Sequence, residues 1–211
     1  MAKQDIYRLL KQDIRRRYWQ PGQALTQQML ASQYQTSRIP VREAMARLQA
    51  EGWLVSHGKA SLQVPALTAA EAAELAMIRL ALEPMALQLA AQQMTHAQLG
   101  AAEDILTRAA VATTTDPLAA GELNWQFHRM LYQSCQQPQL LQLLEQLHEK
   151  AAMYLAVQEQ QFGYAAQSQQ EHWQLLQLLR DGQTEQAVAC LRQHIALAGA
   201  SLQQQLQDSS R

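Results

Sequence analysis

The sequence predicts a mainly α-helical protein made of two domains, and three observations support this. Glycine and proline occur only 8 and 6 times in 211 residues, whereas alanine, leucine and glutamine, which favour helices, are abundant. Apolar residues recur at helical spacing along most of the chain. The net charge is +6 over residues 1–65 and −7 over residues 66–211, which predicts two domains with these bounds and with different partners.

The first domain is expected to contain three short helices followed by a two-stranded hairpin. A helix over residues 3–18 ends at the WQPG turn, and Thr26 is placed to cap a second helix. Thr36 or Ser37 caps a third helix, which has Pro40 in its first turn and ends at Gly52. Segments 53–55 and 62–64 flank a turn and are the candidate strands. This order predicts a winged helix–turn–helix.

The third helix is the candidate reading element, because such a helix presents its N-terminal residues to the major groove of DNA. Arg38 and Arg42 are four residues apart on one face, and a guanidinium there can bind guanine O6 and N7 together or hold a phosphate. Arg47 lies further along and is expected to make a backbone or an internal contact. The alternative for each arginine is an ordinary solvent-exposed helix face.

The second domain is expected to be an all-α bundle of six helices. Their approximate ranges are 68–93, 96–112, 116–133, 138–161, 168–180 and 183–207. Three of these starts have the pattern of a capping box, with a hydroxyl residue followed three positions later by Glu or Gln: Thr68, Thr95 and Ser168. Two others begin at Pro117 and Pro138.

A candidate metal site lies in this second domain. Asn124 and His128 share a helix face, His172 follows a helix start, and His194 lies in the next helix. Antiparallel packing of these helices would direct three imidazoles inward. Three imidazoles and one oxygen suit Zn²⁺ or another borderline divalent ion, although a lone histidine is more often a satisfied polar residue.

Residues 37–48, SRIPVREAMARL, followed by EGWL at 51–54, resemble the recognition-helix signature of GntR-type bacterial transcription regulators. The resemblance covers residues 5–65 and implies that Arg38 and Arg42 contact operator bases and nearby phosphates. It also implies that the wing tip enters the minor groove. Gln28 stands where the FadR branch of this family has an arginine, a departure expected to weaken a phosphate contact or alter specificity. The DNA-contacting set is then Thr36, Ser37, Arg38, Arg42, Arg47, His57, Gly58 and Lys59.

The second domain resembles the FCD effector domain of the FadR subfamily, in its shorter, VanR-like six-helix branch. The matching segments are 79–83, 124–128, 171–176 and 187–194. The resemblance implies that a divalent ion is held by Asn124, His128, His172 and His194, and that a small organic acid binds this ion. Zn²⁺ is the expected ion, with Ni²⁺ and Mn²⁺ as alternatives. Asn124 replaces a commoner aspartate, which leaves the charge of the ion uncompensated and favours an anionic effector.

Two further residues are candidates for the effector pocket. Arg79 is expected to hold an anionic effector or brace the pocket, and the alternative is an ion pair with Glu83 one turn later. His148 lies near the stripe formed by Leu144, Leu147 and Ala151. It is expected either to reach the pocket or to lie on the helix surface.

The resulting hypothesis is a ligand-responsive transcription regulator. It is expected to act as a repressor and to bind a near-palindromic operator as a homodimer. A small organic acid at the metal site would change its operator affinity. Alternatives are a regulator with a structural or decayed metal site, or a three-histidine hydrolase. The chain has no HExxH, glycine-rich phosphate loop or GxSxG motif, so an enzyme is not expected. With two cysteines, a polar N-terminus and no long apolar run, a cytoplasmic location without membrane attachment is expected.

Overall fold

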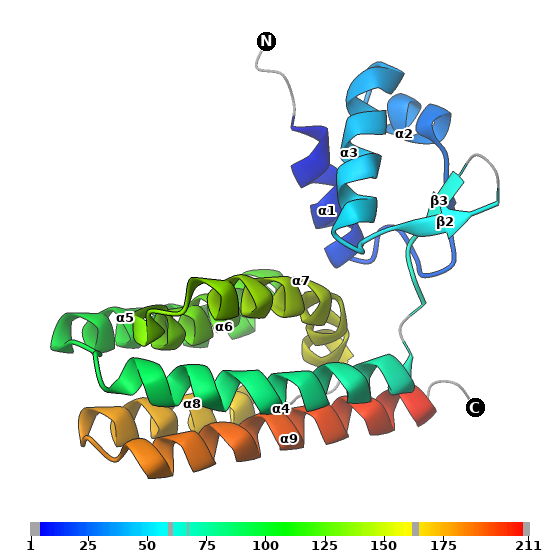
Figure 1. The fold of residues 1–211 in the computed structure, drawn as a ribbon. Helices are drawn as coiled ribbons and strands as arrows, with labels where there is room; N and C mark the ends of the chain where they lie inside the picture. The colour runs from blue at the N-terminus through cyan, green and yellow to red at the C-terminus, as the bar shows by residue number, and fades with distance from the viewer. Residues whose placement is uncertain (1–4, 59–60, 67, 162–164, 209–211) are drawn as a thin grey trace. The chain divides into compact units, whose positions relative to one another are not determined.

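The computed structural model describes residues 5–58, 61–66, 68–161 and 165–208, and the chain divides into two compact units, residues 1–67 and 68–211 (Figure 1). The mainly α-helical class is confirmed, with a helix–turn–helix unit followed by a helical unit. Lys59, a predicted wing residue, lies outside the described residues. In the part that is described, no helix is both long and apolar enough to span a membrane.

The first unit contains three helices and a small antiparallel sheet. The helices are α1 (Ile6–Arg15), α2 (Gln27–Gln33) and α3 (Arg38–Ala50), and the strands are β1 (Ala24–Leu25), β2 (Val55–His57) and β3 (Ser61–Gln63). The strand order is β1-β3-β2, with Ser56 opposite Leu62. The cap of α2 is as expected, because the Thr26 hydroxyl accepts a hydrogen bond from the backbone N–H of Met29.

The sheet differs from the expectation in three ways. Strand β3 covers Ser61–Gln63 and not 62–64. Strand β2 begins at Val55 and not at Trp53, because Trp53 and Leu54 are buried and serve as core residues directly after the turn at Gly52, which has φ +82°. Strand β1 was not predicted. It has only two residues and therefore no alternating pattern to detect, and it exists because β3 offers it a free edge.

The core of the first unit is formed where α1 and α3 pack together. The α1 side chains Ile6, Leu10 and Ile14 are buried, as expected from their spacing. They meet the buried face of α3, which consists of Val41, Ala44, Met45 and Leu48. Full burial of a leucine stabilises the fold by about 1.5–3 kcal/mol, so this contact fixes how the outer face of α3 is presented.

The second unit, in the described residues, contains six α-helices and a short 3₁₀ turn. The helices are α4 (Ala69–Ala91), α5 (His96–Thr115), α6 (Pro117–Tyr132), α7 (Pro138–Gln161), α8 (Ala165–Arg180) and α9 (Thr184–Asp208). The 3₁₀ turn η1 (Gln133–Cys135) follows α6. Helices α4 and α9 run side by side, as do α5 and α6, and α8 packs on both α9 and α5 (Figure 1).

The predicted helix starts are mostly correct. Thr95 and Gln98 form the expected capping box of α5, and Thr68 caps α4. The predicted cap at Ser168 is wrong, because α8 already includes Ala165 and Ala166 and Ser168 lies within the helix. Alanine is the strongest helix former, so the helix extends past the hydroxyl residue toward its N-terminus.

Candidate functional site

The outer surface of the first unit carries the residues predicted to contact DNA. Ser37 is the N-cap residue of α3, and Arg38 and Arg42 are both exposed. The turn before α3 is tight, because Gln35 has φ +49° and the Thr36 N–H donates to the Ala31 carbonyl oxygen at 3.0 Å. Ser37 occupies the N-cap position, but its side chain does not form the expected capping hydrogen bond. The first N–H groups of α3 therefore remain available to a ligand, and they favour anions such as phosphate.

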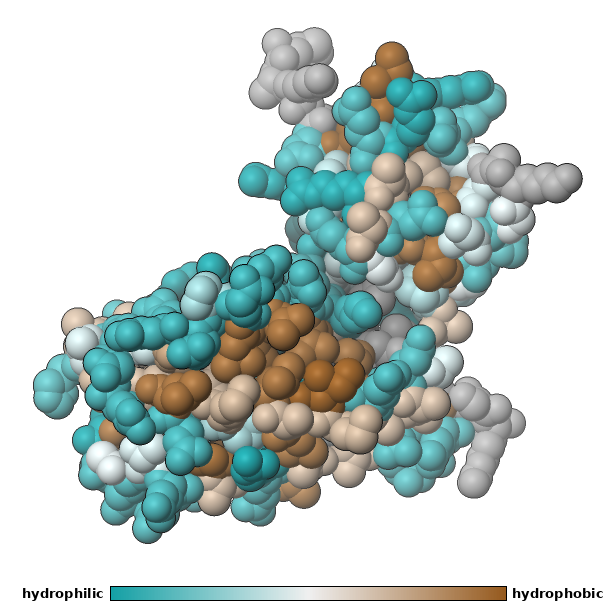
Figure 2. Space-filling model, viewed as in Figure 1, coloured by the Kyte–Doolittle hydropathy of each residue, from teal (hydrophilic) through white to brown (hydrophobic). Residues whose placement is uncertain are grey.

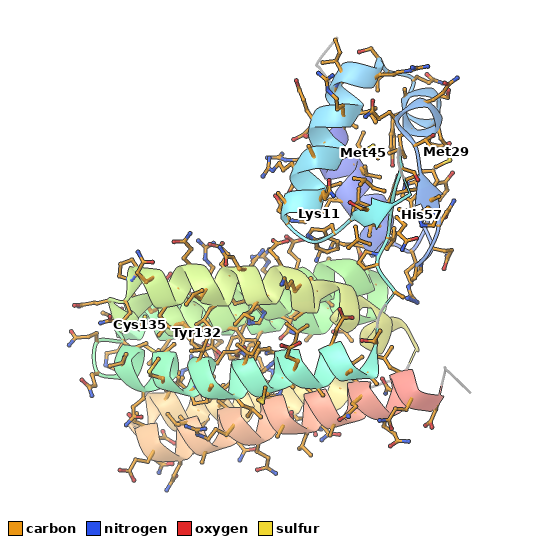
Figure 3. The ribbon with its side chains drawn as sticks, turned by 45° about the vertical axis from the view of Figure 1, so that its right-hand side comes forward. Lys11, Met29, Met45, His57, Tyr132 and Cys135 are labelled. Carbon is orange, nitrogen blue, oxygen red and sulfur yellow. The ribbon has the colours of Figure 1, made fainter. Side chains whose placement is uncertain are left out.

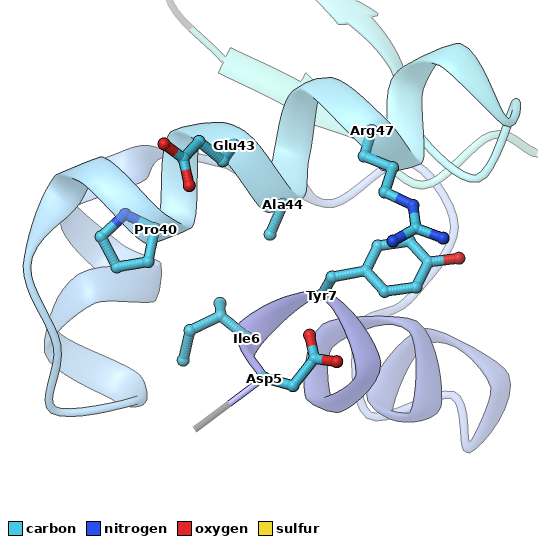
Figure 4. A pocket seen from close by; sticks show the side chains of 7 residues that line it. All are labelled: Asp5, Ile6, Tyr7, Pro40, Glu43, Ala44 and Arg47. Atoms are coloured by element: carbon cyan, nitrogen blue, oxygen red, sulfur yellow. The ribbon is translucent and has the colours of Figure 1, made fainter. Parts of the chain in front are cut away.

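The three arginines of α3 are held differently. The Nη2 atom of Arg38 donates to the Gln28 side-chain oxygen at 2.8 Å, so α2 positions this guanidinium. The guanidinium of Arg47 lies 3.7 Å from the ring centre of Tyr7, and its Nε donates to Glu51 at 3.0 Å (Figure 4). Arg47 therefore contacts its own domain, one of the two options that its position left open. Within the part of the chain that the structure describes, Arg42 forms no hydrogen bond or ion pair and is exposed.

A shallow depression of about 350 Å³ lies between the start of α1 and the outer part of α3 (Figure 4). It is lined by Asp5, Ile6, Tyr7, Pro40, Glu43, Ala44 and Arg47. Its polar groups are of both signs, and Arg47 is already engaged with Tyr7 and Glu51. The depression therefore offers no set of convergent polar groups typical of a small-molecule site.

The wing is formed by β2 and β3. His57 is exposed at the end of β2 (Figure 3), and its carbonyl oxygen accepts a hydrogen bond from the Ser61 hydroxyl at 2.6 Å. Gly58 has φ +61°, a conformation that favours glycine and reverses the chain toward β3. The predicted wing residues His57 and Gly58 thus lie at the tip of the hairpin.

Three predicted metal ligands converge in the interior of the second unit. His128 on α6, His172 on α8 and His194 on α9 are buried. The Nε2 atom of His172 lies 3.2 Å from Nε2 of His128 and 3.3 Å from Nε2 of His194. Two nitrogen ligands about 2.0–2.1 Å from a tetrahedral Zn²⁺ are about 3.3 Å apart, so these spacings fit a shared divalent ion.

The opposite ring nitrogens of two of these histidines are held by hydrogen bonds. Tyr132 donates its hydroxyl proton to Glu83 at 2.7 Å, so its oxygen is free to accept from Nδ1 of His128 at 3.0 Å. Nδ1 of His194 lies 2.6 Å from a carboxylate oxygen of Glu171, which can only accept. Both contacts place a proton on Nδ1. In a neutral imidazole this leaves the lone pair on Nε2, where the three rings meet.

The electrostatic environment keeps the central imidazoles in the form that binds metals. Burial holds the pKa of His128 well below its ordinary value of 6.5, against the opposing charge of Glu83. Burial, together with the neighbouring His194 and His128, also holds the pKa of His172 well below 6.5. Both rings are therefore neutral near pH 7, as ligation requires.

Asn124, the fourth predicted ligand, lies one helical turn before His128 on α6. Its side-chain oxygen Oδ1 is buried and has no hydrogen-bond partner among the described residues. A buried amide oxygen without a partner is costly, by about 1–3 kcal/mol. An oxygen ligand to a cation would remove this cost, so the donor set of three imidazoles and one amide fits a borderline divalent ion such as Zn²⁺.

A buried carboxylate that the sequence analysis did not assign to the site organises its other side. Glu83 on α4 is fully buried and accepts hydrogen bonds from Arg79 and Tyr132. Burial alone would raise the pKa of Glu83, but the charge of Arg79 and the nearby His148 hold it well below 4.5. Tyr132, the last residue of α6, is labelled in Figure 3 on the side of the bundle that faces α4. The sequence signal that could have identified Glu83 is its position as the charged residue in the apolar stretch LALEPMAL, residues 80–87.

The two predicted effector residues adjoin this carboxylate. Arg79 is buried and forms the ion pair with Glu83 that was the alternative interpretation of its spacing. His148 is also buried, so it does not lie on the helix surface. Its ring stacks on Trp125 with 3.7 Å between ring centres, and its Nε2 lies 3.3 Å from Glu83.

Metal-free protein is expected to lose stability as the pH falls below about 6.5. His128, His148 and His172 all have folded-state pKa values below 6.5, because burial disfavours the charged ring. The unfolded chain takes up these protons first, so each histidine costs the fold up to about 1.4 kcal/mol per pH unit below its unfolded pKa. Melting temperatures measured in chelator from about pH 7.5 to 5.5 test this. A flat profile would contradict it, and the double variant His128→Gln, His172→Gln should make the profile less steep, because only His148 of the three then remains.

The comparisons with known proteins agree with both units. Residues 2–64 match the family described as bacterial regulatory proteins, gntR family, and residues 74–197 match the FCD domain. The HTH-type transcriptional regulator YdhC of Bacillus subtilis is 30% identical over 68% of this chain and 65% of its own length, just under two thirds. The HTH-type transcriptional repressor GlaR of Escherichia coli is 29% identical over 71% of this chain and 70% of the relative.

A solved structure extends the similarity to nearly the whole chain. The E. coli protein McbR/YncC has 25% sequence identity and a TM-score of 0.79, covering 95% of this chain and 96% of that one. The matched families consist of transcription regulators and not of enzymes. The chain therefore belongs to the GntR family of bacterial transcription regulators and carries a C-terminal FCD domain.

Proposed function

We propose that this regulator senses a small organic acid through a divalent metal ion, and that the bound acid changes its affinity for an operator. The observation that carries the proposal is that His128, His172 and His194 meet in the buried interior. The Nε2 atom of His172 lies 3.2 Å from that of His128 and 3.3 Å from that of His194. Asn124 lies one helical turn before His128, and its buried oxygen without a partner among the described residues supports its role as a further ligand. Zn²⁺ is the proposed ion, with Ni²⁺ and Mn²⁺ as alternatives.

An anionic ligand suits the charge balance around this ion. As metal ligands, Asn124 and the imidazoles bring no charge to the ion, and Glu83 is already balanced by Arg79. Glu171, hydrogen-bonded to His194, contributes one negative charge against the two positive charges of the ion. A carboxylate would complete the shell and neutralise the site. We propose that Arg79 and His148 line one side of the effector pocket and hold the acid there.

The DNA-binding form is proposed to be a homodimer on a near-palindromic operator, because a two-fold arrangement presents one recognition helix to each half-site. The second unit supports this with an apolar area on the face seen in Figure 2. Its exposed apolar side chains include Met77, Met85 and Leu89 of α4 and Leu143 of α7. Repression is the proposed sense of regulation, and GlaR, one of the relatives, is named as a repressor.

The proposal is tested by measuring operator binding with metal-free and Zn²⁺-loaded protein, using an operator selected from random DNA. Small mono- and dicarboxylic acids are then added one at a time. An acid that acts through the site should shift operator affinity by about 5–150-fold in loaded protein and have no effect on the variant His128→Ala. If no acid binds loaded protein, measured by calorimetry, effector sensing is wrong.

A purely structural metal is the second candidate, and one observation favours it. His128 has no exposed surface, so an acid would have to enter the bundle to reach the ion. A structural ion would raise the unfolding free energy of the second unit without binding any acid. The calorimetric experiment separates the two functions, because only a sensing site binds both the metal and an acid.

The substitution Arg42→Ala is expected to weaken specific operator binding by about 1–3 kcal/mol, because this exposed guanidinium lies on the outer face of the recognition helix. Fluorescence anisotropy at fixed salt measures the change. Arg129→Ala is the matched control, since Arg129 lies at the end of α6, where its contact with Glu145 is long at 3.8 Å. Equal operator affinity for Arg42→Ala and the unaltered chain would contradict the assignment.

A further inference from the structure

The recognition helix exposes one large apolar side chain that the fold does not use. Ile39, the second residue of α3, has 60% of its surface exposed, whereas the apolar residues Val41, Met45 and Leu48 of the same helix are buried. An isoleucine with this exposure gains much less from folding than a buried one, because burial is the source of its stabilising effect. Its position therefore points to a contact outside the chain.

The direction of Ile39 follows from the geometry of the helix. At about 100° per residue, Ile39 lies about 170° from the centre of the buried face of α3. Arg42 lies about 60° to one side of it on the same exposed surface. Ile39 is thus at the middle of the outward face, in the first turn, where recognition helices of this type meet the edges of base pairs.

The surroundings of Ile39 favour DNA over a protein partner. Arg38 precedes it, Arg42 follows it, and Gln28 holds the Arg38 guanidinium at 2.8 Å. Glu43 is the nearest acidic side chain on the outward face, and the domain as a whole has a net charge of +6. The N-terminal end of α3 adds a partial positive charge beside it. An apolar side chain in this setting is brought close to phosphates and the major groove.

We propose that Ile39 is a specificity-determining residue that reads the C5-methyl group of a thymine in each operator half-site. The major groove offers one apolar group on its floor, the thymine methyl, and small aliphatic side chains recognise it by contact. The methyl lies next to the base or phosphate bound by Arg38, since the two residues are adjacent. This inference rests on the proposed operator binding by the first unit.

The probes are operators that the whole chain selects from random DNA. In each probe, one symmetric pair of thymines is replaced by deoxyuridine, which lacks only the methyl group. For the unaltered protein, substitution at one symmetric thymine pair should weaken binding about fourfold per half-site, the value of burying one methyl at about 0.8 kcal/mol. Both half-sites together should give about 16-fold. The variant Ile39→Ala should bind thymine and deoxyuridine operators equally.

Ile39→Val is the matched control, because it keeps a branched aliphatic group and should retain most of the preference. Since Ile39 is exposed, all variants should keep the melting temperature of the unaltered chain. The proposal is overturned if no thymine responds to deoxyuridine, or if Ile39→Ala keeps the full penalty. Failure to select any operator would overturn the proposed function as well, whereas a selected operator without a methyl response would overturn this inference alone.

Discussion

The substitution His172→Ala is expected to lower Zn²⁺ affinity by at least about 100-fold and to leave purified protein without a stoichiometric ion. Its Nε2 is the central atom of the cluster, 3.2 Å from that of His128 and 3.3 Å from that of His194. Loss of a residue that merely orients a ligand typically costs 10–100-fold in metal affinity, and loss of a ligand itself costs more. Elemental analysis and competition with a chromophoric chelator measure the two quantities.

His96→Ala is the matched control for this measurement. His96 is the first residue of α5 and is exposed, so its loss removes an imidazole from the chain without touching the cluster. This variant should bind one ion per chain with unchanged affinity. If His172→Ala retained one tightly bound ion, or if His96→Ala lost it, the assignment of the cluster would be wrong.

The substitution Glu83→Ala is expected to lower the unfolding free energy by about 3–5 kcal/mol, which is the usual cost of removing one partner from a buried ion pair. Glu83 has no exposed surface, and its removal would leave the charge of Arg79 buried without its carboxylate. Tyr132 would also lose the acceptor of its hydroxyl proton. Urea unfolding of the metal-free protein at pH 7.5 measures the change.

Glu103→Ala is the control, because Glu103 also pairs with an arginine but does so at the surface. Its partner is Arg180, and both side chains are substantially exposed, at 42% and 32%. Surface pairs contribute about 0–1 kcal/mol, so this variant should unfold close to the unaltered chain. Equal effects of the two substitutions would show that the buried network around Glu83 does not stabilise the second unit.

Much of this protein could be predicted from local sequence. The helix ends follow from short-range rules: Thr26 and Thr95 cap their helices because a hydroxyl oxygen can accept the free N–H groups of the first turn. The buried faces of α1 and α3 follow from apolar spacing of three and four residues. The metal candidates His128, His172 and His194 were found from their placement on separate helices and from the FCD resemblance.

Other features depend on partners distant in the chain. Arg47 was expected to make a backbone or an internal contact, and the choice between them depends on Tyr7, 40 residues earlier, on whose ring its guanidinium lies. Strand β1 exists because of an edge supplied by β3, almost 40 residues later. The cap predicted at Ser168 is wrong for a local reason and not a distant one. The alanines before Ser168 favour helix, so the helix begins before it.

The sequence by itself determined the two-domain division of charge, the helical class and most of the capped helices, because these depend on composition and on neighbours within one or two turns. The histidines of the candidate metal site came instead from their placement on separate helices and from the FCD resemblance. Only the tertiary structure decided that three imidazoles meet at spacings of 3.2–3.3 Å. It also decided that Glu83 gathers Arg79, Tyr132 and His148 around a buried charge. Such contacts join α4, α6 and α7, or α6, α8 and α9, and packing fixes them because a buried polar group must find its partner wherever the fold places one.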